Sequence, residues 1–187
     1  MSNKINAFKP LVMQNVLEQL LVHGSLNEKV SPQVGIDFDS PYFYVILVDI
    51  NNLGDFQDLE NENSFDEAAQ LSFVAMSNIF LETLSPLGKA YSGKIDDTII
   101  IILNTNDMNY DNVLSHAQNA YTMSQKYLDM TATIIISEVA HGVSELPLVY
   151  QDALNRLEYS SIMESTGVAA PTAGDFSSSP LQADRTD

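Results

Sequence analysis

The chain has 187 residues, no cysteine, and 25 acidic residues against 8 basic ones, which gives a formal net charge of -17. This length suffices for one domain with a hydrophobic core, and the lack of cysteine excludes disulfides, thiolate metal sites and cysteine catalysis. An acidic surface repels phosphate backbones and anionic lipids, so we expect no direct nucleic-acid contact and no membrane contact. Such a surface more often serves only solubility.

The apolar runs of the sequence are short. The longest, YFYVILV and TIIIIL, fall well below the roughly 20 residues that a membrane-spanning helix requires. The first ten residues, MSNKINAFKP, contain neither the apolar core nor the small-residue cleavage site of a signal peptide. We therefore expect a cytoplasmic protein.

The chain is predicted to start with a helix, a loop and a strand. Residues 8–23 place apolar side chains at helical spacing, and Gly24 is a natural stop. The loop that follows contains Pro32 and Pro41 as breakers. Residues 42–50 form a nearly continuous apolar strand, which indicates burial on both of its faces. The apolar face of the first helix comprises Phe8, Leu11, Val12, Val16 and Leu20.

Two further helices flank a predicted hairpin. After an acidic, irregular stretch, residues 64–84 form a helix, and Ser64 with Glu67 has the pattern of a capping box. Residues 89–103 read as a hairpin of two strands, and residues 110–129 as a helix. The apolar faces of the two helices are Ala69, Phe73, Met76, Phe80 and Leu84, and Val113, Ala117, Ala120, Tyr121, Ser124 and Leu128.

The last elements are a strand, a helix and a tail. Residues 131–140 form the strand, and Ser144 is predicted to cap a helix that has Pro147 in its first turn and ends at Gly167. From residue 169 the text AAPTAGDFSSSPLQADRTD shows no periodicity and is rich in Ala, Ser, Pro and Asp. We predict that residues 169–187 are a disordered tail or linker.

This order predicts an α+β fold in one domain, residues 1–168. Its inner unit is βαββαβ, which can fold as a ferredoxin-like palm. The two inner helices then cover one face of the sheet, and the extra N-terminal and C-terminal helices can cover the other.

Acidic residues gather at one end of this predicted palm. The end of the first strand carries Asp49, and the hairpin turn carries Asp96 and Asp97, so the palm brings these positions close together. Two carboxylates there could hold Mg²⁺ against a triphosphate. Acids at strand ends and in turns are also commonly just solvated. A metal site at Asp49 and Asp97 therefore remains a minor hypothesis beside a solvated hairpin.

Three stretches resemble the motifs of GGDEF domains. VILVDINNLGDF is similar to their first strand and metal loop, with Asp49 on the leading aspartate. KIDDTIIIIL falls on the GGDEF motif and the strand after it, and LVYQDALNRLEYSSIMESTG resembles the last helix. The text FKPLVMQNVLEQLLVHG ahead of VGIDFDSPYFYVILVDI, the apolar strand at the motif and LPLVYQDALNRLEY most resemble the degenerate GGDEF-like domain of AraC-type transcription regulators. The resemblance covers roughly residues 8–167.

The departures from the GGDEF motif affect the nucleotide site. Lys94 and Ile95 stand at the two glycine positions, where glycine lets the backbone approach a nucleotide closely. Asp97 replaces the glutamate and Thr98 the phenylalanine. In the metal loop, Asn51 replaces an acid two residues after Asp49, and Gly54 stands where the resemblance implies a phosphate-binding lysine. We therefore expect no catalytic residue, no cofactor and no diguanylate cyclase activity.

Other kinds of site have weaker support. His23, His116 and His141 are far apart in the sequence and match no metal-ligand spacing, so we expect surface or helix-end histidines. The acidic stretch DLENENSFDE lacks the sharp-turn glycine of a calcium loop and leads into a helix. No phosphate-binding loop, nucleophile elbow or dinucleotide fingerprint occurs.

The resemblance implies a non-catalytic signalling domain of a bacterial AraC-type regulator. The parent would carry a helix-turn-helix region after this domain and often a sensor before it. We expect a homodimer formed through the domain or its N-terminal helix, although helix 8–23 could equally just pack on its own sheet. The alternative function is a nucleotide-binding receptor domain or a divergent nucleotide cyclase of the GGDEF family.

Overall fold

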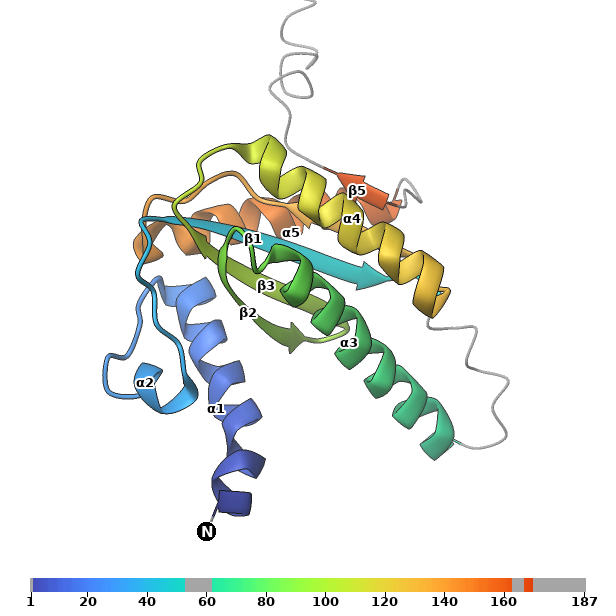
Figure 1. Ribbon diagram of the computed structural model, residues 1–187, viewed down its shortest axis with the longest axis horizontal. Helices are drawn as coiled ribbons and strands as arrows, with labels where there is room; N and C mark the ends of the chain where they lie inside the picture. The colour runs from blue at the N-terminus through green and yellow to red at the C-terminus, as the bar shows by residue number, and fades with distance from the viewer. Residues whose placement is uncertain (1, 53–61, 163–166, 170–187) are drawn as a thin grey trace, which may run out of the picture.

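The computed structural model describes residues 2–52, 62–162 and 167–169 (Figure 1). A five-stranded sheet of order β2-β3-β1-β4-β5 lies at its centre. The first four strands of this order pair antiparallel, and β5 joins β4 in parallel at one edge. The strands are β1 Tyr42–Ile50, β2 Gly88–Ile95, β3 Thr98–Thr105, β4 Ala132–Ile136 and β5 Gly167–Ala169.

Helices cover both faces of the sheet, as the sequence predicted. On one face, α3 and α4 pack side by side, while α1, α2 and α5 lie on the other face (Figure 1). A short 3-10 helix, η2, leads into α5. The helices are α1 Ser2–His23, α2 Ser31–Val34, α3 Glu62–Leu84, α4 Tyr110–Leu128, η2 Val143–Glu145 and α5 Leu146–Ile162.

The apolar strands form the centre of two cores, because successive side chains of a strand point to opposite faces. In β1, Tyr44, Ile46 and Val48 pack toward α3 and α4, whereas Phe43 and Leu47 pack toward α1 and α5. The predicted burial of this strand on both faces is therefore confirmed. The inner faces predicted for the helices 64–84 and 110–129 are also buried or partly buried. The predicted side chains of Phe8, Leu11 and Val12 lie outside the described part.

One proline of the first loop acts differently from the prediction. Residues 31–34, predicted as loop, form the short helix α2, and Pro32 lies in its first turn, where the missing amide hydrogen costs nothing. Gly35, with φ of +77°, ends α2 in the left-handed conformation. Pro32 thus starts a helix instead of breaking the chain.

Both predicted caps were misplaced. Helix α3 begins at Glu62, so Ser64 lies inside it and cannot cap its start; the side chain of Ser64 is outside the described part. Ser144 lies in η2, and α5 begins two residues later. The cap patterns missed these boundaries for two reasons. Helix α3 begins before its cap pattern, and a 3-10 turn precedes α5.

The C-terminal elements also differ from the prediction. Helix α5 ends at Ile162, and Gly167 begins β5, where it pairs with Thr133. Ala169, assigned to the tail from sequence, belongs to this strand, and residues 170–187 lie outside the described part. Pairing with the edge of β4 therefore makes Ala169 part of the sheet.

The strand predicted at 131–140 is interrupted after Ile136. At Ser137 the hydroxyl oxygen accepts a hydrogen bond from the Val45 amide at 2.8 Å, a place that a backbone carbonyl would take in a regular ladder. Beyond Ser137, an isolated antiparallel bridge joins Phe43 and Ala140. A side-chain acceptor thus ends β4 early.

Candidate functional site

The β2–β3 hairpin closes with a two-residue turn, Asp96 and Asp97. The turn lies between the paired residues Ile95 and Thr98, because β2 continues up to Ile95. Asp96 has a φ of +52°, a left-handed conformation that aspartate tolerates better than most residues. Both side chains are exposed.

The fold brings Asp49 to the same end of the sheet, as the sequence predicted. Asp49 is half-buried near the end of β1 and pairs with Thr98, the first residue after the turn. Burial raises the pKa of Asp49, and the nearby charge of Asp97 raises this pKa further. The charge of Asp97 therefore makes Asp49 harder to ionise.

A lysine side chain lies beside Asp97. Lys94 places its Nζ 3.8 Å from Asp97 Oδ1, and this ammonium also lies 4.1 Å from the centre of the Phe73 ring. Within the described residues, no group of three or more His, Asp or Glu side chains could hold a metal ion. The positive charge beside Asp97 is thus supplied by the protein itself.

The raised pKa of Asp49 predicts a pH dependence of folding. The folded state keeps the Asp49 proton to a higher pH than the unfolded chain, so this group favours folding when protonated and loses that contribution as the pH rises through its folded-state pKa. Asp49→Asn should therefore be more stable than the parent at pH 7, and the gain should vanish below about pH 4. Urea unfolding at both pH values measures the difference.

The matched control is Asp66→Asn, which changes an exposed carboxylate on α3. It should be nearly neutral at both pH values, within about 0.5 kcal/mol. A loss of stability in Asp49→Asn at pH 7, or a gain that persists unchanged in acid, would show that the ionised Asp49 carboxylate does not oppose folding.

The two positions that the GGDEF resemblance assigns to glycines are used for packing. Lys94 accepts a hydrogen bond through its carbonyl oxygen from Gln14 Nε2 and donates its amide hydrogen to Gln14 Oε1 at 3.1 Å. Ile95 packs against the core beneath α1 and α5. The backbone at Lys94, which a glycine pair would leave open to a ligand, is covered by a side chain of α1.

The residue at the expected second acid, Asn51, has a structural role. Its side-chain amide exchanges hydrogen bonds with the Thr133 hydroxyl at 3.3 and 3.4 Å, and its backbone amide donates to Thr131. The neighbouring Asn52 also binds this part of the chain, by donating to the Asp129 carbonyl. These bonds fasten the end of β1 to the start of β4. Gly54 lies outside the described residues.

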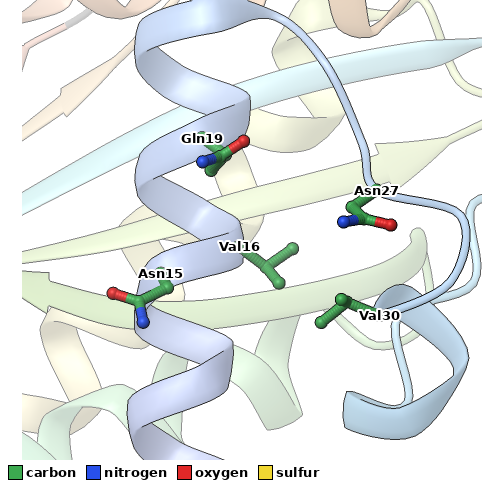
Figure 2. A pocket seen from close by; sticks show the side chains of 5 residues that line it. All are labelled: Asn15, Val16, Gln19, Asn27 and Val30. Atoms are coloured by element: carbon green, nitrogen blue, oxygen red, sulfur yellow. The ribbon is translucent and has the colours of Figure 1, made fainter.

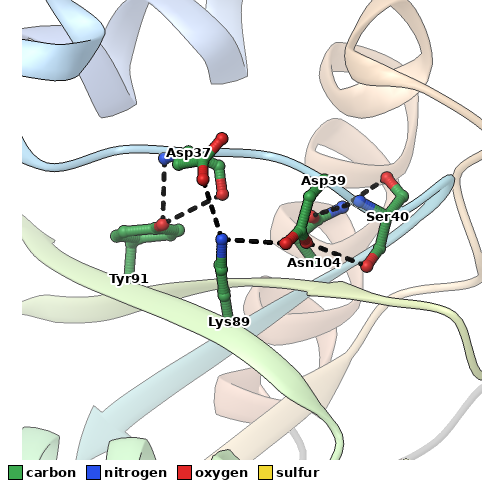
Figure 3. Close-up of polar contacts among 6 residues, drawn as sticks. All are labelled: Asp37, Asp39, Ser40, Lys89, Tyr91 and Asn104. Carbon is green, nitrogen blue, oxygen red and sulfur yellow. Dashed lines mark hydrogen bonds and ion pairs between the residues drawn. The ribbon is translucent and has the colours of Figure 1, made fainter.

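At the far end of β2, a polar cluster fastens the loop after α2 to the sheet (Figure 3). Lys89 Nζ lies 2.9 Å from both Asp37 and Asp39, and these hydrogen bonds raise the pKa of Lys89. The Tyr91 hydroxyl accepts from the Asp37 amide, and the buried Asn104 side chain binds the same loop. The exposed ion pairs are worth little individually. We assign this cluster a structural role, because its contacts hold the loop after α2 against β2 and β3.

A surface cavity of about 270 Å³ lies between α1 and the loop that enters α2 (Figure 2). Three carboxamide side chains, Asn15, Gln19 and Asn27, surround it together with Val16 and Val30. The carboxamides are exposed, and Val16 is buried. No charged side chain is among these lining residues. Sequence reasoning did not find this cavity, because its walls come from separate elements.

The three histidines lie on separate segments of the chain. His23 is exposed at the end of α1, and His116 lies on α4, where its Nδ1 is 2.6 Å from the Asn112 carbonyl. The backbone amide of His141 donates to Glu145, and this bond, followed by the His141 side chain, lowers the pKa of Glu145. None of these contacts brings two histidines together.

One feature of the core was not predicted. The hydroxyls of Tyr44 and Tyr110 are buried, and neither has a hydrogen-bond partner among the described residues. Their ring centres are 6.3 Å apart. Burial raises the pKa of both hydroxyls, that of Tyr44 to about 12, so both groups are neutral near pH 7. Tyrosine and phenylalanine give the same apolar pattern, so periodicity carries no signal for these hydroxyls.

No family model matches the chain, and no curated protein matches its sequence. Among solved structures, a regulator of polyketide synthase expression from Bifidobacterium adolescentis matches with a TM-score of 0.51 and 10% identity, over 89% of this chain and 59% of that one. The chain thus spans about three fifths of that regulator's length. At this identity the likeness shows a shared mixed α+β fold and nothing about activity.

Two GGDEF domains are also similar in structure. One is a microbial GGDEF domain described in its interaction with bis-(3,5)-cyclic di-GMP, with a TM-score of 0.49 and 13% identity over 86% of this chain and 88% of that one. The other is the active GGEEF domain of a diguanylate cyclase from Vibrio cholerae, with a TM-score of 0.48 and 12% identity over 70% and 83%. Likenesses at this distance carry no argument about function.

Proposed function

We propose that this chain is a non-catalytic regulatory domain of the GGDEF-like fold, which relays a signal within a cytoplasmic bacterial transcription regulator of the AraC type. The strand order β2-β3-β1-β4, with antiparallel pairing throughout, supports a ferredoxin-like palm at its centre. No helix in the described part of the chain is long and apolar enough to cross a membrane. Signals would enter through α1 and leave toward a helix-turn-helix region of the parent protein.

The observation that carries this proposal is the occupation of the hairpin by the protein's own groups. Gln14 holds both backbone groups of Lys94, and the Lys94 ammonium sits between Phe73 and Asp97. A nucleotide that approached the turn would have to displace these contacts. The side chain of Asn51 is likewise bound to Thr133 instead of being free for a metal.

Incubation with GTP and either Mg²⁺ or Mn²⁺ should give no cyclic dinucleotide, since the covered Lys94 backbone cannot cradle a phosphate. Liquid chromatography of the nucleotides measures the product, with an active diguanylate cyclase as positive control. Turnover that disappears in Asp49→Ala would contradict the proposal, because it would assign Asp49 a role with the substrate metal.

A nucleotide-binding receptor is the second candidate, and the proximity of Asp49 and Asp97 favours it. A thermal-shift series with GTP, ATP and cyclic dinucleotides plus Mg²⁺ separates the two. A ligand at 100 times its dissociation constant adds about 2.7 kcal/mol of stability. No ligand should produce such a shift if the domain only relays a signal. A shift lost in Asp97→Asn would favour the receptor, or a divergent cyclase if turnover accompanied it.

The partners of this domain follow from the same proposal. The regulator would act as a homodimer, formed through the domain or through α1, whose N-terminal end extends away from the sheet (Figure 1). The net charge of -17 opposes direct contact with DNA, so a separate basic region of the parent would bind the operator. A parent reading frame with a helix-turn-helix region downstream of this domain is the expected context, and its absence would contradict the AraC-type assignment.

A further inference from the structure

Lys94 connects the two helical layers of the domain. Its backbone amide and carbonyl are both bound by the side chain of Gln14 on α1. Its ammonium lies over the ring of Phe73 on α3, 4.1 Å from the ring centre. Helices α1 and α3 cover opposite faces of the sheet. The contact between them thus runs around the free edge of the sheet, through one residue of β2.

The bond pattern explains why Gln14 fits this place. In an antiparallel ladder, every second residue of an edge strand directs its N–H and C=O away from the neighbouring strand. Ile95 and Thr98 flank the turn as a pair, so the groups of Lys94, one residue before, point outward. A glutamine carboxamide has the same donor and acceptor as a peptide group. The Gln14 carboxamide therefore binds the outward-facing backbone groups of Lys94 as the peptide group of a neighbouring strand would.

Close approach of α1 depends on the glycine beside Lys94. A Cβ atom at Gly93 would lie 2.5 Å from Leu17 Cδ1 and 3.0 Å from Gln14 Oε1. Leu17 is 1% exposed and packs in the core beneath α1. Gly93 leaves room for the side chains of Leu17 and Gln14 where α1 approaches the backbone of Lys94.

We propose that Gln14, Leu17 and Gly93 form a latch through which the position of α1 sets the conformation of the hairpin turn. When α1 shifts, the carboxamide leaves the backbone of Lys94, and the Lys94 side chain changes its contacts with Phe73 and Asp97. A movement on one face of the sheet thereby reaches α3 on the other. The latch deepens the proposed relay function and rests on it only for the direction of the signal.

The test is Gln14→Met, which keeps the length of the side chain and removes both hydrogen bonds to Lys94, together with the bond that Gln14 donates to Glu18 on the same helix. The matched control is Gln19→Met, an exposed glutamine of the same helix that faces the cavity toward α2. Nuclear magnetic resonance of the full chain measures hydrogen exchange at the Lys94 amide and the chemical shifts of the Phe73 ring. In Gln14→Met, Lys94 exchange should accelerate at least about fivefold, and the Phe73 ring signals should move. Gln19→Met should change neither.

A second variant grades the effect. Gln14→Glu keeps an acceptor for the Lys94 amide, loses the donor to the Lys94 carbonyl and faces the carboxylate of Glu18, so its exchange rate should lie between those of the parent and Gln14→Met. Unchanged Lys94 exchange in Gln14→Met, or faster exchange with an unmoved Phe73 ring, would overturn the latch. Neither readout involves nucleotide turnover, so failure of the latch and failure of the proposed function remain distinguishable.

Discussion

Replacing Ile100 with alanine should lower the free energy of unfolding by about 2–5 kcal/mol, as measured by urea denaturation. Ile100 lies in β3 and is 1% exposed, in the core formed with α1 and α5. Strand β3 is held on both sides, because it pairs with β1 over its whole length and with β2 as well. The strand therefore cannot collapse into the space that the truncated side chain leaves, and the cavity persists.

The contrasting variant carries Asp96→Asn and Asp97→Asn together and should change stability by no more than about 0.5 kcal/mol. Asparagine tolerates the left-handed conformation of residue 96, and an exposed ion pair such as that of Lys94 with Asp97 contributes little. A cost below about 1 kcal/mol for Ile100→Ala would show a core that relaxes around the truncation. If the double variant were less stable only when Mg²⁺ was present, the acids would form a metal site.

The parts of the fold that the sequence predicted are those with a local cause. Strands 42–50 and 98–103 are rich in β-branched and aromatic residues, and their burial follows from their nearly continuous apolarity. The inner helices were found from one apolar stripe each. The predicted features that failed, such as the caps at Ser64 and Ser144, depend on how far a helix continues, which tertiary packing decides.

In the candidate site, too, some features could be predicted from the sequence and others depend on tertiary packing. The proximity of Asp49 and Asp97 follows from the order of strands, so it could be predicted from the sequence. The contact of Gln14 with Lys94 joins residues 80 positions apart in the chain, and the sequence near either residue carries no sign of it. Gly93 was read only as part of a hairpin, although its role is to make room for Leu17. Long-range contacts between layers therefore decide what the hairpin can do.

Gly88→Ala should destabilise the domain by about 3 kcal/mol or more, because the clash involves backbone atoms that cannot turn away. A Cβ atom at Gly88 would lie 2.1 Å from the carbonyl oxygen of Asn104 and 3.1 Å from the Cα atom of Thr105. The backbone of β3 cannot yield at this point, since Asn104 is fully buried and its side chain donates to the carbonyl oxygens of Ser40 and Tyr42. Relief would require β2 to separate from β3.

Two other glycines separate the clash from the ordinary effects of glycine. A Cβ atom at Gly142 would meet nothing within 4 Å, and its φ of 163° is extended, so Gly142→Ala should stay within about 0.5 kcal/mol of the parent. Gly35 also faces open space but has a φ of +77°, so Gly35→Ala should cost about 1–2 kcal/mol through backbone strain alone. The expected order of urea midpoints is Gly142→Ala, Gly35→Ala and then Gly88→Ala, from highest to lowest. Equal midpoints for the Gly88 and Gly142 variants would mean that β2 and β3 are not in close contact at this end. In that case β2, the strand that carries Lys94, would be anchored mainly by Gln14 and the hairpin turn.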